Sequence, residues 1–318
     1  QLILSPKDIL SEKLHVYNSN QPSLLMHREL VDSNTALKFN QSLIKVSAAV
    51  KDELTAKCLK NMSLFAARKA VNCNLGEIDD VRDWMINHTL PVIDLGQKMF
   101  NYAERNMLEN PDAKKHLLDF CHNIGFNIED MAVEKDYMSL TPEMIQFIKS
   151  SGQLSDENAS KLSKDPKMPN GFKTDFIVSV INKRGKEIYT LPKASQSEGT
   201  LRAMGIETAL YVAEQNNKLL PIDEIETSMH PLLLKFMIQS FLKVQSRSQL
   251  LLTTHYDPLF TAVDDYLRKD SFWLMDKRDD GHSELYPLIS KNGVNKMRSL
   301  QRAYLNNKLG ALPQIANV

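Results

Sequence analysis

The feature of this sequence that most constrains its fold is a short apolar run, Leu219 to Ile222, which ends in two adjacent carboxylates, Asp223 and Glu224. Such a run predicts a buried strand, and polar residues at its end mark the carboxyl edge of a sheet, where ligands bind in α/β proteins. Successive strand side chains point to opposite faces, so the two carboxylates are expected to have different roles. One is suited to a hydrated Mg²⁺ and the other to an attacking water, which is the division that nucleoside triphosphate hydrolysis requires.

Two further segments predict parts of the same site. Residues 195–200 read Ser-Gln-Ser-Glu-Gly-Thr and precede a helical pattern, so Ser197 or a neighbour is expected to cap a helix whose free N–H groups and Gly199 accept a phosphate. Residues 249–252 form a second apolar strand, followed by Thr253, Thr254 and His255. Taken singly, the strand that ends in Asp223 and Glu224 is equally compatible with an ordinary acidic loop, and residues 197–200 with an ordinary helix cap.

The order of the three segments adds to this interpretation. Ser-Glu-Gly-Thr at 197–200, Ile-Asp-Glu-Ile-Glu-Thr-Ser-Met-His-Pro at 222–231 and Leu-Leu-Thr-Thr-His at 251–255 resemble the carboxyl half of an ABC-type ATPase head. The likeness is to the bacterial AAA/OLD-like ATP-binding family and, more remotely, to SMC heads, and it covers roughly residues 190–310. It implies an α/β fold with a P-loop NTPase sheet flanked by helices, and it implies ATP and Mg²⁺ as cofactors.

The resemblance also implies residue roles. Asp223, in the Walker B motif, orders Mg²⁺ through water, Glu224 activates the hydrolytic water, and the switch residue His255 steadies the γ-phosphate. Ser197 and Gly199 act on ATP held by a second head, so nucleotide and dimerisation are linked. They lie in residues 195–200, here named the signature segment. The candidates for cofactor binding are Gln196, Ser197, Gly199 and Thr254.

One departure from the family pattern concerns the phosphate cradle. The 318 residues contain no Gly-x-x-x-x-Gly-Lys-Ser/Thr, and Gly185-Lys186 has the wrong context. In the family this Walker A motif precedes the segments found here, so it is expected before Gln1 or on a partner. Two functions stay open: an ATPase that drives or gates an effector in anti-phage defence or DNA maintenance, and a non-catalytic structural or regulatory subunit that binds a partner.

The remaining chain predicts three parts. Residues 1–39 are expected to be mainly strands of the nucleotide-binding lobe, with short strands at 2–4, 14–17 and 24–26. Residues 40–170 are expected to be a helical insertion with a polar linker from 150 to 171. Residues 171–318 form the carboxyl-terminal lobe, with hairpins at 176–191 and 272–288.

Helix starts are predicted at Asn110-Pro111 and Thr141-Pro142 within the insertion. In the carboxyl-terminal lobe, a further helix is predicted to begin at Pro231. Pro221 is unusual for a central strand, because it has no N–H to donate. His116, Cys121 and His122 lack the spacing of metal ligands.

The composition gives no positive indication of a nucleic-acid or membrane partner. Lysine plus arginine and aspartate plus glutamate each number 39, so no global basic field indicates nucleic acid, and a DNA contact is possible but unsupported. Three cysteines without a Cys-x-x-Cys pattern suit a reducing cytosol and predict core thiols. No apolar run has membrane-spanning length, so the expected location is cytoplasmic, with no membrane partner.

Overall fold

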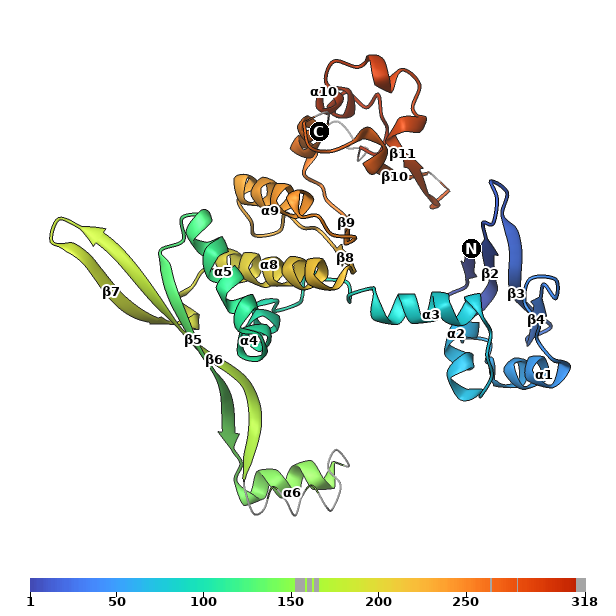
Figure 1. The fold of residues 1–318 in the computed structure, drawn as a ribbon, viewed down its shortest axis with the longest axis horizontal. Helices are drawn as coiled ribbons and strands as arrows, with labels where there is room; N and C mark the ends of the chain where they lie inside the picture. Colours follow the sequence, from blue (N-terminus) through green and yellow to red (C-terminus); the bar gives the residue numbers. More distant parts are fainter. Residues whose placement is uncertain (152–157, 159–161, 163–165, 264, 279, 313–318) are drawn as a thin grey trace. The chain divides into compact units, whose positions relative to one another are not determined.

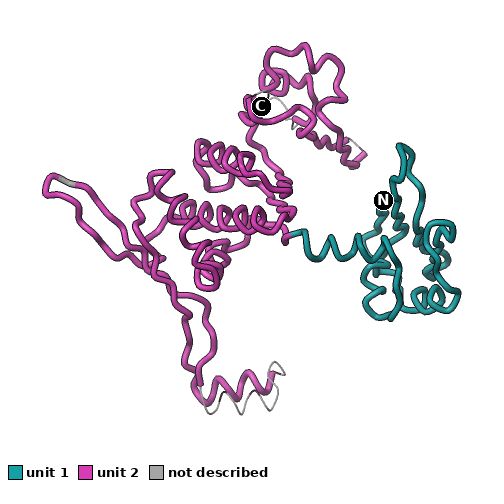
Figure 2. Tube along the Cα trace, in the orientation of Figure 1, with its two compact units in different colours: residues 1–89 teal, residues 90–318 magenta. Residues whose placement is uncertain are grey.

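The computed structural model describes residues 1–151, 158, 162, 166–263, 265–278 and 280–312. The chain divides into two compact units, residues 1–89 and residues 90–318 (Figure 2). The described residues form a mixed α/β structure whose strands pair into four small sheets (Figure 1). The three-part division expected from the sequence, with boundaries after residues 39 and 170, stays a prediction.

The first unit combines a meander of antiparallel strands with short helices. Its strands pair in the order β1 (Leu2–Leu4), β2 (Ile9–Val16), β3 (Ser23–Val31) and β4 (Asn34–Phe39). Its helices are α1 (Ala48–Lys57), α2 (Leu64–Ala67) and α3 (Glu77–Asn87). The predicted early strands are confirmed, while β2 begins at Ile9, earlier than expected, and β4 was not predicted. Apolar side chains of the sheet and helices form one core that includes Leu25, Leu54 and Ile78.

Helix α8 (Glu198–Asn216) is the centre of the second unit. It packs against α4 (Phe100–Glu109), α5 (Pro111–Asn123), α9 (Pro231–Lys243) and β8 (Leu219–Ile222) (Figure 1). Nine consecutive residues of α8, Arg202 to Leu210, are buried, so this helix is covered on all sides rather than amphipathic. The helix starts predicted at Asn110-Pro111 and Pro231 are confirmed, because the side chains of Asn110 and His230 cap α5 and α9.

Strand β8 lies between two parallel neighbours. It pairs along its length with β9 (Gln249–Leu252), and an isolated parallel bridge joins Ile222 to Ile93 on its other side. Both predicted strands are therefore confirmed. The Pro221 carbonyl accepts from the Ile93 N–H at 3.0 Å. Strand pairing on this side of β8 is irregular, so the missing N–H of Pro221 interrupts no continuous ladder and the proline is tolerated.

Three long antiparallel strands correct the helical prediction for part of the insertion. β5 (Ile128–Ser139) and β6 (Lys167–Asn182) pair over almost their whole length, and β7 (Gly185–Pro192) pairs with the second half of β6. The sequence pattern predicts helix for residues 128–139 and linker for residues 167–171, and both predictions are wrong. The reason is that each segment completes the other's hydrogen bonding, with a register shift beside Gly171, whose φ is 104°.

The hairpin predicted at 176–191 is confirmed, since Asn182 pairs with Gly185. The helix predicted from Thr141-Pro142 is also confirmed as α6 (Pro142–Ser150), which the Thr141 side chain caps. Most of the predicted linker after Ser151 lies outside the described residues.

The last part of the second unit has its own small core. β10 (Trp273–Lys277) and β11 (Ser283–Pro287) form the predicted terminal hairpin, followed by α10 (Leu300–Leu305). Phe260, Leu274 and Leu288 are among the residues buried there. Among the described residues, no helix combines the length and apolar composition needed to cross a bilayer.

The cysteines are unpaired, and Cys58 and Cys121 are buried. Burial raises the pKa of the Cys121 thiol to about 12, as expected of a core thiol.

Candidate functional site

A group of polar side chains gathers where β8 and β9 end. Because Ile222 is in register with Leu252 in a parallel pair, the chain leaves both strands at the same edge of the sheet. We name the residues that follow the strand-end cluster. Its members are Asp223, Glu224, Glu226, Thr253, Thr254 and His255.

The hydroxyl of Thr253 joins the two strand ends. It donates to Oδ1 of Asp223, and it accepts from the backbone N–H of Glu224 at 2.9 Å. A single hydroxyl thus fixes one carboxylate and the backbone of the next residue. The sequence predicts a role for Thr254 and none for Thr253, although the strand register places Thr253 directly opposite Asp223.

Glu224 and His255 approach each other across the cluster. Nε2 of His255 lies 4.0 Å from Oε1 of Glu224, and the two side chains are 87% and 36% exposed. Glu224 has a φ of 44°, in the left-handed region that a non-glycine residue adopts at a cost of about 1 kcal/mol. The backbone therefore turns sharply at Glu224, and both groups remain accessible to a ligand.

Glu226 organises the loop after β9. Its Oε1 accepts from the backbone N–H of His255 at 2.7 Å, and its Oε2 accepts from the hydroxyl of Thr254 at 2.7 Å. These bonds hold the backbone of His255 and engage the Thr254 hydroxyl within the cluster. The sequence patterns predict no role for Glu226, although it lies two residues after Glu224.

The signature segment lies against the loop that follows Glu224. Ser197 caps α8 by accepting from the Thr200 N–H at 3.0 Å, which confirms the predicted cap. Gly199 is necessary for close approach, because a Cβ there would collide with the carbonyl oxygen of Ser228. In the described part of the chain, no hydrogen bond joins Gln196, Ser197 or Gly199 to the strand-end cluster. The structure thus brings together Asp223, Glu224, Thr254 and His255, and leaves the signature residues as a separate group.

A buried cation, Arg202, was not anticipated from the sequence. The residue is 7% exposed, and its Nη1 donates to the carbonyl of Asp94 at 3.4 Å, while Nε and Nη2 have no hydrogen-bond partner. Burial lowers the pKa of the Arg202 guanidinium, and the charges of Glu198, Asp94 and Glu224 oppose that shift. Arg202 therefore places positive charge near Glu224.

The donor set at Asp223 fits a hydrated cation. The Thr253 hydroxyl occupies Oδ1, which leaves Oδ2 for a metal-bound water. No group of three or more His, Cys, Asp and Glu side chains within the described residues is arranged to hold a metal. Mg²⁺ in phosphate sites keeps several waters and uses one or two carboxylates, so Asp223 does not need such a group.

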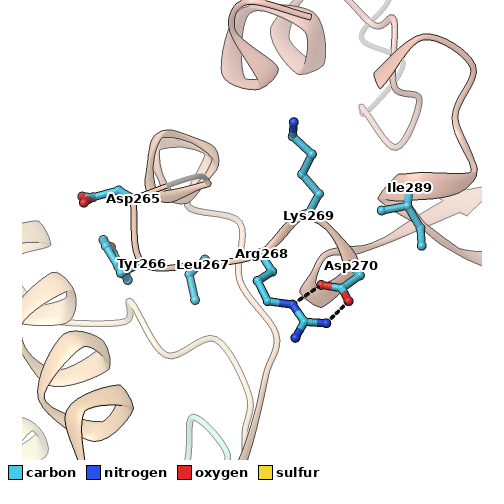
Figure 3. Close-up of a pocket in the computed structure, with 7 residues that line it drawn as sticks. All are labelled: Asp265, Tyr266, Leu267, Arg268, Lys269, Asp270 and Ile289. Atoms are coloured by element: carbon cyan, nitrogen blue, oxygen red, sulfur yellow. Dashed lines mark hydrogen bonds and ion pairs between the residues drawn. The ribbon is translucent and has the colours of Figure 1, made fainter. Parts of the chain in front are cut away.

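A shallow depression in the last part of the second unit offers no comparable chemistry (Figure 3). Its lining contains no member of the strand-end cluster, and its Arg268 and Asp270 side chains bind each other. The residues that line it are Asp265, Tyr266, Leu267, Arg268, Lys269, Asp270 and Ile289.

Comparison with known proteins gives one family match. A family model described as "AAA domain, putative AbiEii toxin, Type IV TA system" matches residues 7–261. No curated protein matches the chain. The matched range contains the signature segment, β8, β9 and every member of the strand-end cluster.

Proposed function

Because this chain belongs to the AAA domain family matched over residues 7–261, we propose that it is an ABC-type ATPase head that hydrolyses ATP at the strand-end cluster. The observation that carries this proposal is the meeting of Asp223, Glu224 and His255 at the ends of adjacent parallel strands. A carboxylate for Mg²⁺, a second carboxylate for water and a polar group for the terminal phosphate are three of the parts that phosphoryl transfer uses, beside a phosphate cradle.

The two carboxylates differ in their surroundings, which supports different roles. Asp223 is held by the Thr253 hydroxyl at one oxygen, and it would bind Mg²⁺ through water at the other. Glu224 is positioned through its backbone and faces His255, so its carboxylate is available to accept a proton from the attacking water. His255 is mostly exposed and would donate to the γ-phosphate. Magnesium, when bound, neutralises the charge that develops on the phosphate oxygens.

We propose that the signature segment completes the site of a second copy. Ser197 and Gly199 start a 19-residue helix whose N-terminus provides N–H groups and a positive dipole end. This N-terminus packs on the loop at Ser228 rather than bonding to the strand-end cluster of its own chain. ATP then bridges two heads, and Gln196 and Thr254 are lesser candidates for contact with it.

The family description names a toxin–antitoxin system. We propose that ATP turnover serves a defence or DNA-maintenance function by driving or gating an effector. The strand-end cluster contains no group that distinguishes one effector from another.

The test is Glu224→Gln in the full-length protein. We expect steady-state phosphate release to fall about 10²- to 10⁴-fold, as when a general base is removed, and an ATP-bound dimer to accumulate in sedimentation experiments. The exposed Glu109→Gln on α4 is the matched control and should behave as wild type. Unchanged turnover in Glu224→Gln would refute the assignment of the base.

Equilibrium binding of labelled ATP separates catalysis from a purely structural role. Full-length protein that binds no ATP would support a non-catalytic partner-binding subunit and contradict the ATPase proposal. Submicromolar binding by the 318-residue chain alone would contradict the non-catalytic alternative.

A further inference from the structure

A buried ion pair lies directly before the signature segment. Lys193 begins a single 3₁₀ turn, Lys193–Ser195, and its Nζ lies 2.8 Å from Oε2 of Glu104 on α4. The Glu104 side chain is fully buried, at 0% exposure, and that of Lys193 is 30% exposed. The other carboxylate oxygen of Glu104 accepts from the Thr174 hydroxyl on β6 at 2.6 Å. One carboxylate thus connects a helix, a strand and the turn that leads into the signature segment.

The Lys193 ammonium is well satisfied in this position. Besides Glu104, it donates to Oδ1 of Asn101 at 2.9 Å and lies 5.2 Å from the centre of the Phe100 ring. All of these partners belong to α4. An ammonium has three donors, so two hydrogen bonds and one ring contact specify a single location for it. The network therefore fixes the start of the turn on α4.

The chain is fixed again after the signature segment. Met99, just before α4, packs so closely on α8 that a Cβ at Gly205 would fall 2.5 Å from the Met99 carbonyl carbon. The chain is therefore held against the start of α4 on both sides of Ser197. Before Ser197 the Lys193 contacts hold it, and after Ser197 the close packing of Gly205 on Met99 does. On the strand side, Pro192 at the end of β7 is in register with Asp175, the neighbour of Thr174.

A buried ion pair contributes little net stability, because desolvation offsets much of the attraction, and apolar replacements of similar volume are often as stable. What a fully bonded pair provides is a defined geometry. We propose that Glu104 and Lys193 are positioning residues that hold the signature segment in the orientation needed to act on ATP bound by a second copy. This inference rests on the proposed function.

The position of the pair makes a specific kinetic prediction. The strand-end cluster that binds a chain's own ATP shares no hydrogen bond with Glu104 or Lys193 in the described part of the chain. Loosening the pair should therefore lower turnover while leaving ATP affinity intact. Misplacement of a reacting group by about 1 Å can cost about 100-fold in rate, so the loss expected for Lys193→Met is about 10- to 100-fold in kcat.

The experiment compares four forms of the full-length protein: wild type, Lys193→Met, the double variant Glu104→Leu/Lys193→Met, and Lys186→Met. The last removes an exposed lysine that pairs with Glu129 at 2.8 Å on the same sheet, and it serves as the matched control. We expect Lys193→Met to lose turnover with an ATP Kd within about twofold of wild type. The double variant should have the melting temperature of wild type but the low turnover of Lys193→Met. An apolar pair restores the packing at positions 104 and 193 without restoring the orientation of the signature segment.

Mixed dimers provide the second measurement. Lys193→Met combined with Glu224→Gln on separate chains leaves one composite site with an intact base and an intact signature segment, so about half of the wild-type rate should return. Placing both changes on one chain and mixing it with wild type leaves no intact site in the mixed dimer, whose turnover should fall at least as far as that of Lys193→Met.

Recovery of turnover together with stability in the double variant would overturn the inference, as would equal losses of ATP affinity and turnover in Lys193→Met. These outcomes differ from failure of the proposed function, in which wild-type protein would show no ATP turnover.

Discussion

Acidic side chains occupy two contrasting settings in the unit that begins at Leu90. The carboxylates of the strand-end cluster follow the end of β8, and that of Glu224 is 36% exposed. The carboxylates on the helices are enclosed: the side chain of Glu104 is 0% exposed and that of Glu207 on α8 is 8% exposed. An exposed carboxylate remains available to a cation or a substrate, whereas a buried one requires a partner within the fold.

The helix carboxylates obtain partners in different ways. Glu104 uses both oxygens within the fold, on Thr174 and Lys193. Oε1 of Glu207 accepts from Nε2 of His116 at 2.8 Å, and its Oε2 has no partner. For Glu214, about two helical turns further along α8, burial and the charge of Glu207 raise the pKa to about 7. Changes at the strand ends should therefore affect activity, and changes at Glu207 and Glu214 should affect stability.

The largest expected effect is at Asp223. Asp223→Asn should lower ATP turnover of the full-length protein by about 100-fold or more, since the metal supplies several kcal/mol of charge stabilisation. Because the site is open, the free energy of unfolding should change by less than about 0.5 kcal/mol. Phosphate release measured across a Mg²⁺ titration and urea unfolding check the two halves of this prediction. If Asp223→Asn lost much stability but kept normal turnover, the strand-end carboxylates would not differ in role from the buried helix carboxylates.

The next effect is at His116, the partner of Glu207. His116→Ala leaves a buried carboxylate unpaired and removes a ring stacked on Tyr211 at 4.5 Å, so unfolding free energy should fall by about 2 kcal/mol. His122→Ala, an exposed histidine on the same helix, is the control and should cost less than about 0.5 kcal/mol. Urea denaturation of both variants measures the difference, and equal losses would show that the His116–Glu207 contact does not stabilise the fold.

The smallest effect should depend on pH. A carboxyl whose pKa rises from 4.5 to about 7 on folding binds its proton more tightly in the folded chain, so stability is lost as pH rises through that range. Glu214→Gln removes this loss. A shift of one pKa unit corresponds to about 1.4 kcal/mol, and partial exposure reduces this value. Glu214→Gln should therefore raise the free energy of unfolding by about 1–2 kcal/mol at pH 8 and by almost nothing at pH 4.

Chemical denaturation at the two pH values tests this, with the exposed Glu109→Gln as control. His116 opposes the shift at Glu214, so the same measurement in a His116→Ala background should show a larger gain. If Glu214→Gln stabilises equally at both pH values, the gain comes from the helix propensity of glutamine and not from the titration of Glu214.

The sequence alone determined the elements whose signals are local. The apolar runs at 219–222 and 249–252 are strands, and Ser197, Asn110 and Thr141 cap the helices predicted to follow them. A run of side chains and a capping residue act within a few positions along the chain, so they can be recognised without knowing their neighbours. The same locality predicted the candidate site, because Asp223, Glu224 and His255 directly follow their strands.

Tertiary structure decided what depends on distant partners. Residues 128–139 became β5 because β6, about 40 positions later, completes their hydrogen bonds. Thr253 rather than Thr254 meets Asp223 because strand register selects it. Glu104 lies in a polar stretch of α4, and its burial against Lys193, 89 residues away, follows from helix packing. Burial and pairing depend on the whole set of neighbours, which no local pattern contains.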